Sequence, residues 1–178
     1  MNSIKGKFAL VTGGTQGLGA AIAKNFAENG AEGIITIGRK EEKGKEVAKK
    51  IQEETGCKVI FVKTDLPNVQ ECRNAVTVAK KNFGKLDVLV NAAGITDRGN
   101  IVNTSEELFD KMIGTNVKGP FFLIQETVKI MIDQGIHGSI INIGYVSALT
   151  GQPFISAYCT SKGALATLTR NTAFALLN

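Results

Sequence analysis

The chain contains two tyrosines, Tyr145 and Tyr158, and both lie in the segment GYVSALTGQPFISAYCTSK at residues 144–162. Lys162 follows Tyr158 by four positions, so the two side chains share one face if the segment is helical. A phenol has a reference pKa of about 10, and a nearby ammonium group lowers it by stabilising the phenolate. The spacing therefore indicates a proton donor and acceptor at Tyr158, although a core tyrosine beside a surface lysine produces the same pattern.

A second segment that could serve a functional site is TGGTQGLG, at residues 12–19. Gly13 permits a tight turn, Gly17 lets a ligand approach the backbone, and Gly19 lets a helix pack closely on a strand. The amino end of the following helix offers free backbone N–H groups to a phosphate. The segment alone fits a plain turn equally well, but its place in the first strand–helix unit favours dinucleotide binding.

The elements that must position these residues alternate along the chain. Five short runs rich in Ile and Val predict strands covered on both faces, at residues 7–12, 33–38, 58–64, 86–91 and 139–144. Because helical patterns separate them, we expect a parallel sheet with right-handed crossovers. The prediction is one α/β domain over residues 1–178, a doubly wound Rossmann-type fold with ligands beyond the carboxyl ends of the strands.

Two helices carry recognisable start signals. Asn68 with Glu71 three residues later forms a capping pattern, and Gly84 can end that helix. Thr104 with Glu107 predicts a second start by the same logic.

Composition narrows the classes of function. The net charge is +5, but the lysines alternate with glutamates in segments such as RKEEKGKEVAKK, which favours solvated helix faces over nucleic-acid binding. No apolar run reaches membrane-spanning length and no signal-peptide core is evident, so a cytoplasmic protein without membrane partners is expected. Cys57, Cys72 and Cys159 lack metal-binding spacing, and the single histidine, His137, lies in a predicted surface turn. We therefore expect no metal site.

Taken together, the motifs resemble those of the short-chain dehydrogenases/reductases, including members similar to 3-oxoacyl-carrier-protein reductases and to sugar or polyol dehydrogenases. The resemblance covers essentially the whole chain and rests on TGGTQGLG at 12–19, Asp65 in KTDL, NAAG at 91–94, Asn116 in TNVKG, and YCTSK at 158–162. It implies an NAD(P)(H)-dependent enzyme that interconverts a small carbonyl compound and a secondary alcohol by hydride transfer.

The resemblance also implies roles for individual residues. Tyr158 would be the acid/base, Lys162 would lower its pKa and hold the nicotinamide ribose, and Asn116 would support a proton relay. The cofactor would contact Gly13, Thr15, Gln16, Gly17, Leu18, Gly19, Arg39, Lys40, Asp65, Leu66, Asn91, Ala92, Ala93, Gly94, Tyr158 and Lys162.

The end of the second predicted strand bears on the choice of cofactor. Proteins that bind NAD usually have a carboxylate there, whereas proteins that bind NADP have a cation. The chain has Gly38 in that position, followed by Arg39 and Lys40. NADP(H) is therefore favoured over NAD(H), although the two cations can also simply begin a charged helix.

Two departures from the family pattern keep another interpretation open. Tyr145 stands where the family usually has a serine that hydrogen-bonds the substrate carbonyl, and Ser147 is the alternative donor nearby. Relatives continue for roughly another third of their length, so we expect the family fold to be cut after the fifth strand and its following helix. The competing hypothesis is a catalytically impaired nucleotide-binding module. Relatives also suggest a homo-oligomer, either a dimer or a tetramer.

Overall fold

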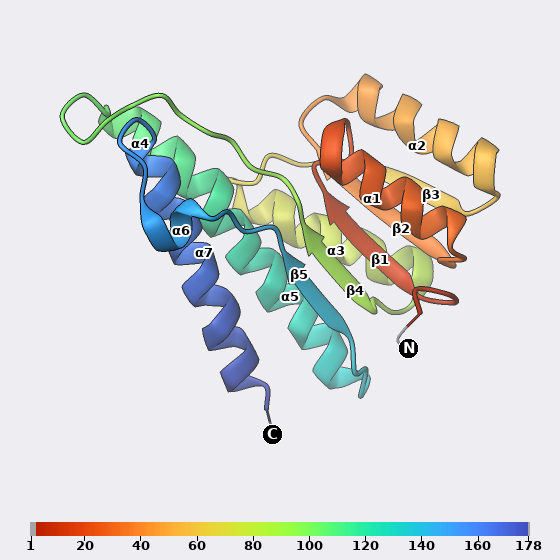
Figure 1. The fold of residues 1–178 in the computed structure, drawn as a ribbon. Coiled ribbons are helices and arrows are strands. Elements are labelled where there is room, and N and C mark those ends of the chain that lie inside the picture. Colours follow the sequence, from red (N-terminus) through yellow and green to blue (C-terminus); the bar gives the residue numbers. More distant parts are fainter. Residues whose placement is uncertain (1–2, 178) are drawn as a thin grey trace.

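A computed structural model describes residues 3–177 of the chain (Figure 1). The expectation of a cut at Asn178 falls outside this range, as do Met1 and Asn2. Five parallel strands form one sheet in the order β3-β2-β1-β4-β5. They are β1 (Phe8–Thr12), β2 (Gly33–Gly38), β3 (Lys58–Lys63), β4 (Val88–Asn91) and β5 (Ser139–Asn142). The predicted doubly wound α/β fold is confirmed.

Helices cover the two faces of the sheet. On one face, α1 (Gly17–Glu28) and α2 (Glu41–Thr55) pack over a buried cluster that includes Ala9, Val11, Ile34, Ala23 and Ile51. On the other face, α3 (Val69–Phe83) and α5 (Gly119–Asp133) cover a cluster that includes Leu10, Ile35, Leu89, Cys72 and Leu123. Alternate residues of β1 thus face opposite layers, which is the pattern of a strand buried on both sides.

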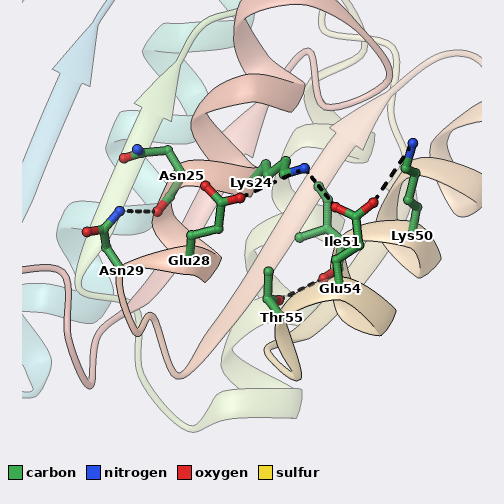
Figure 2. A network of polar contacts seen from close by, with 8 residues as sticks. All are labelled: Lys24, Asn25, Glu28, Asn29, Lys50, Ile51, Glu54 and Thr55. Carbon is green, nitrogen blue, oxygen red and sulfur yellow. Dashed lines mark hydrogen bonds and ion pairs between the residues drawn. The ribbon is translucent and has the colours of Figure 1, made fainter.

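Polar contacts connect α1 with α2 at their exposed surface (Figure 2). The ammonium of Lys24 lies 2.7 Å from the carboxylate of Glu54 and 3.8 Å from that of Glu28, and Lys50 lies 3.9 Å from Glu54. Exposed ion pairs of this kind contribute little to stability. The position of α1, and hence of the glycine-rich turn before it, is set by the buried cluster beneath.

The predicted capping of α3 is confirmed, whereas the predicted start of α4 is wrong by one residue. Asn68 accepts hydrogen bonds from the N–H groups of Gln70 and Glu71, and Gly84 ends the helix in the left-handed conformation. Ser105, not Thr104, caps α4 (Glu106–Ile113). The hydroxyl of Thr104 donates instead to the carbonyl of Asn100, four residues earlier.

A π-helical turn, η1 (Gly114–Lys118), joins α4 to α5 without a break in the helical run. Pro120 has no N–H group and cannot donate to the carbonyl of Asn116, four residues earlier. The N–H of Gly119 donates to the carbonyl of Gly114, five residues earlier. The wider turn sets the direction in which the Asn116 side chain leaves the helix, and π-turns of this type occur often at functional sites.

The prediction that all five strands are covered on both faces is wrong for β5. Its residues alternate between exposed and half-buried, and the Ile141 side chain is 43% exposed. In the described part of the chain, α5 and α7 (Ser156–Ala175) lie over one face of this edge strand, and no helix covers the other (Figure 1). Among the helices described, none is both long and apolar enough to cross a membrane.

Candidate functional site

A cleft of about 260 Å³ opens at the carboxyl ends of β1, β2 and β4. The predicted cofactor residues that line it are Gly13, Thr15, Gln16, Gly17, Leu18, Gly19, Arg39, Asp65, Leu66, Ala92, Ala93 and Gly94. Lys40, Asn91, Tyr158 and Lys162 are not among the lining residues. The Asn91 side chain is buried and donates to the Asn142 side chain at 2.8 Å, so it ties β4 to β5. Ile95 and Thr115 also line the cleft, and sequence reasoning missed both.

The glycines make the turn at the mouth of this cleft possible. A Cβ at Gly19 would lie 2.5 Å from the carbonyl oxygen of Gly13 and 2.6 Å from that of Thr12, so only glycine fits there. Gly13 and Gly17 have positive φ values of 76° and 56°. A Cβ at Gly17 would meet nothing within 4 Å, which leaves that side of the backbone open to a ligand.

The amino end of α1 faces the cleft in a form suited to an anion. No side chain caps this end and its first turn has no acidic residue. The first N–H groups of a helix lack partners within the helix and carry its positive dipole. The residues present therefore fit the phosphate groups of a dinucleotide.

A group of cations lies at the end of β2, beside the same turn. Within residues 3–177, neither Arg39, Lys40 nor Lys43 forms an ion pair with a carboxylate. The nearby acid, Glu41, is held instead by Lys45 at 2.8 Å and Lys63 at 3.8 Å. The Lys43 ammonium donates to the side-chain oxygen of Gln16 at 2.9 Å. Positive charge at this rim is thus available to an anionic ligand.

Tyr158 and Lys162 lie on α7, as predicted, and the lysine is 5% exposed. Its Nζ donates to the carbonyl of Ile143, just after β5, at 2.7 Å. The same atom lies 5.7 Å from the centre of the Tyr158 ring. Burial lowers the pKa of the Lys162 ammonium. Lys162 thus links α7 to the end of β5 through the Ile143 carbonyl, with its ammonium near the Tyr158 ring.

The expected effect of Lys162 on the tyrosine is not seen in the structure. The pKa of Tyr158 is raised, first by burial and then by the neighbouring Tyr145 and Cys159. The Lys162 ammonium lies over the phenol ring and donates a hydrogen bond to the Ile143 carbonyl. In this state of the molecule Tyr158 is held in its protonated form.

Asn116 connects the loop after β4 with α7. Its amide nitrogen donates to the carbonyl of Ile95 and to the hydroxyl of Ser161, both at 2.9 Å, and its oxygen accepts from the Ile95 N–H at 2.9 Å. The Ser161 hydroxyl donates in turn to the carbonyl of Tyr158 at 2.8 Å. Ser161 is fully buried and was not predicted as a site residue. Its place in YCTSK, one residue before the lysine, was the available signal.

Gly94 marks the point where these groups approach the cleft. A Cβ at this glycine would lie 3.4 Å from the Asn116 oxygen and 3.7 Å from the Lys162 nitrogen. Gly94 also lines the cleft, so the amide and the ammonium stand next to the predicted cofactor site.

The two candidates for the family's serine position differ in their surroundings. The Tyr145 side chain is half-exposed, and its ring centre lies 5.4 Å from that of Tyr158 in an edge-to-face arrangement. The Ser147 hydroxyl is buried at the start of α6 (Ser147–Thr150) and has no hydrogen-bond partner. Tyr145 therefore occupies the space directly beside the predicted acid.

Cys57, Cys72 and His137 take no part in this arrangement. Burial raises the pKa of the Cys72 thiol to about 11, which makes it an inert core residue, and His137 is exposed. In the part of the chain that the structure describes, no group of three or more His, Cys, Asp or Glu side chains could hold a metal ion.

Comparisons of the sequence with known proteins all point to the same family. The sequence model of the short chain dehydrogenase family matches residues 7–178. A Thermotoga maritima protein named "uncharacterized oxidoreductase" is 42% identical over 96% of this chain, and an NADP-dependent (R)-specific alcohol dehydrogenase of Lentilactobacillus kefiri is 36% identical over 96%. The chain spans 66% of the length of each relative.

A solved structure shares the fold closely. The short chain dehydrogenase/reductase of Burkholderia phymatum in complex with NAD superimposes with a TM-score of 0.94 at 28% identity, covering 99% of this chain and 62% of that one. The chain belongs to the short-chain dehydrogenase family.

Proposed function

We propose that this chain forms the cofactor-binding and proton-transferring part of an NADP(H)-dependent oxidoreductase that interconverts a carbonyl group and a secondary alcohol. The observation that carries the proposal is that the Asn116 amide and the Lys162 ammonium lie beside Gly94, which lines a cleft suited to phosphate, and that the Tyr158 ring lies close to the same ammonium. Family membership supports the reaction class.

The residues present fit a dinucleotide. The glycine turn and the amino end of α1 would bind its phosphates, and the segment 92–94 would lie along its adenosine side. A bound nicotinamide would supply the hydride in reduction and accept it in oxidation.

Proton transfer would be the task of Tyr158. The Tyr158 hydroxyl is protonated at neutral pH, so it carries the proton that the oxygen of a ketone takes up under reduction, and its raised pKa makes it a weaker acid than a free phenol. In oxidation the same oxygen would accept the proton of the alcohol. An ammonium has three N–H donors, and Lys162 gives one to Ile143, so two remain for a ribose hydroxyl or for water.

The preference for NADP(H) rests on Arg39. A guanidinium binds phosphate with two parallel hydrogen bonds, and no carboxylate of the described residues pairs with Arg39. The L. kefiri relative is named as NADP-dependent, whereas the B. phymatum structure holds NAD.

We also propose small carbonyl compounds and secondary alcohols as substrates, in a cytoplasmic homo-oligomer. The assembly is supported by apolar side chains exposed at two separate places, Ile141 on the uncovered face of β5 and Phe174 on α7, which a partner subunit would bury.

The proposal is tested by following NADPH absorbance with a panel of ketones, for the protein and for Tyr158→Phe. We expect turnover by the unmodified protein, and a loss of about 10²-fold or more in the variant, because the acid is removed while the ring remains. NADPH binding is measured in parallel by fluorescence. Binding without turnover of any ketone would favour the nucleotide-binding module instead.

A further inference from the structure

A continuous run of hydrogen bonds leads from the cleft to the backbone of the proposed acid. Ile95, which lines the cleft, bonds to the Asn116 side chain through its N–H and through its carbonyl, both at 2.9 Å. The Asn116 amide nitrogen donates to the Ser161 hydroxyl at 2.9 Å, and that hydroxyl donates to the Tyr158 carbonyl at 2.8 Å. Ser161 thus connects the π-helical turn η1 to the helix that carries Tyr158.

The surroundings of Ser161 offer Asn116 no equivalent acceptor. The Ser161 side chain is fully buried and the Asn116 side chain is 1% exposed. The remaining neighbour of the amide nitrogen is the sulfur of Met112 at 3.2 Å, and a thioether is only a weak acceptor. A buried N–H group that loses its acceptor is left both desolvated and unpaired, which is unfavourable. The place of the Asn116 side chain therefore depends on the Ser161 hydroxyl.

The same hydroxyl helps to fix the direction in which the Asn116 amide is turned. A hydroxyl has one proton, and Ser161 donates it to the Tyr158 carbonyl, so toward Asn116 it acts as an acceptor. On the other side, the Ile95 N–H donates to the amide oxygen. Both contacts keep the amide nitrogen toward Ser161. The oxygen stays near Gly94, where a Cβ would lie 3.4 Å from it.

We propose that Ser161 is a positioning residue, which holds Asn116 in the place relative to Tyr158 that proton transfer needs. Its hydroxyl bonds to the Asn116 side chain and to the peptide group of Tyr158, so its effect on the reaction passes through these two residues. This inference rests on the proposed function, because it assigns a task within the same site.

The first test compares Ser161→Ala with Thr160→Ala in NADPH-dependent ketone reduction. Thr160 is the matched control, because it precedes Ser161 on α7 and its hydroxyl also donates to a helix carbonyl, that of Ser156 at 3.0 Å, but it is exposed. We expect kcat to fall by about 10-fold in Ser161→Ala, the upper range for one neutral hydrogen bond. The Kd of NADPH should stay nearly constant, because the glycine turn is unchanged. Thr160→Ala should alter neither quantity.

A double-mutant cycle separates positioning from a general effect on stability. If Ser161 acts through Asn116, Ser161→Ala should change kcat by less than about twofold in the Asn116→Ala background, where the bond between them is already lost. Thermal melts of all variants set an assay temperature at which each is folded. Equal losses of kcat in the two backgrounds, or a lower melting temperature with kcat unchanged, overturn the inference.

A spectroscopic measurement distinguishes failure of this inference from failure of the proposed function. The chain has two tyrosines, so protein labelled with fluorotyrosine gives two fluorine NMR signals, and Tyr145→Phe identifies the signal of Tyr158. We expect Ser161→Ala to shift this signal in the unmodified protein but not in the Asn116→Ala background, and Thr160→Ala to leave it in place. If no ketone is reduced, that pattern upholds the positioning role while the oxidoreductase proposal fails. A Tyr158 signal that Ser161→Ala leaves unchanged overturns the role of Ser161.

Discussion

Replacing Tyr145 by serine tests how this chain holds the oxygen of its substrate. The phenol hydroxyl of Tyr145 lies much further from the backbone than a serine hydroxyl would, and the ring stands 5.4 Å from the ring of Tyr158, edge to face. The ring therefore lies directly beside the proposed acid. In Tyr145→Ser a short hydroxyl donor replaces that ring.

Two opposing effects of this change can be estimated. One oxyanion-binding donor is worth about 10²–10³ in rate, so we expect kcat/KM for ketone reduction to rise by about 10², which equals about 2.7 kcal/mol. The edge-to-face pair contributes about 0.5–1.5 kcal/mol of stability, and the Tyr145 side chain is 45% exposed, so loss of its buried half costs about 1–2 kcal/mol more. The melting temperature should therefore fall by about 5–10 °C.

The assay is NADPH oxidation with one ketone at several concentrations, together with a thermal melt of each variant. Tyr145→Phe keeps the ring and removes the hydroxyl, so it reports whether the phenol oxygen itself binds substrate. If the serine variant melts several degrees lower, as expected, but reduces ketones no faster than the unmodified protein, the reasoning about Tyr145 is refuted. Ser147, whose buried hydroxyl lacks a partner, would then be the next donor to replace.

Three further predictions concern the cofactor turn and the acid. Arg39→Glu should weaken NADPH binding by about 10-fold or more while changing NADH binding far less, because the phosphate loses its cation, and equal losses in fluorescence titrations would remove the phosphate role. Gly19→Ala should destabilise the fold by about 1–3 kcal/mol, since its Cβ would meet the Gly13 carbonyl at 2.5 Å, whereas Gly163→Ala, with 3.8 Å to its nearest neighbour, should leave the melting temperature unchanged or raise it. Reduction should be independent of pH from about pH 6 to about 9, because burial keeps the pKa of Tyr158 above its ordinary value of about 10, and a decline already near neutral pH would contradict that shift.

Local rules predicted much of the fold because the residues that decide it are near one another in sequence. Runs of Ile and Val located all five strands, and the Asn68 cap with Gly84 fixed both ends of α3. The start of α4 was missed by one residue because Thr104 and Ser105 are both suitable caps, and only the loop geometry, in which Thr104 bonds to Asn100, selects between them.

The exposed face of β5 could not be predicted in the same way. Its sequence, SIIN, has the apolar character of a buried strand, but burial depends on which elements lie over it. The apolar sequence indicates that the strand can be buried on both faces. Whether both faces are buried depends on where the helices lie.

The site shows the same limit more sharply. The i,i+4 spacing correctly placed Tyr158 and Lys162 on one helix, but spacing gives no information about where an ammonium group points. The direction of the Lys162 side chain is decided by the Ile143 carbonyl, which lies at the end of β5 and accepts a hydrogen bond from the ammonium at 2.7 Å. The partners of Asn116 likewise come from Ile95 and Ser161, and the turn that aims it depends on Pro120.

These contacts explain how a raised pKa at Tyr158 is compatible with its proposed role. Burial destabilises the charged form of Lys162 and so lowers its pKa. The ammonium group donates a hydrogen bond to the backbone carbonyl of Ile143. A ligand that offers hydroxyl groups near Gly94 would add acceptors around the same ammonium and bring polar atoms close to the phenol. The pKa of Tyr158 therefore depends on the ligand that occupies the cleft. A pH profile of the cofactor-loaded protein measures that pKa, which the amino-acid pattern alone does not determine.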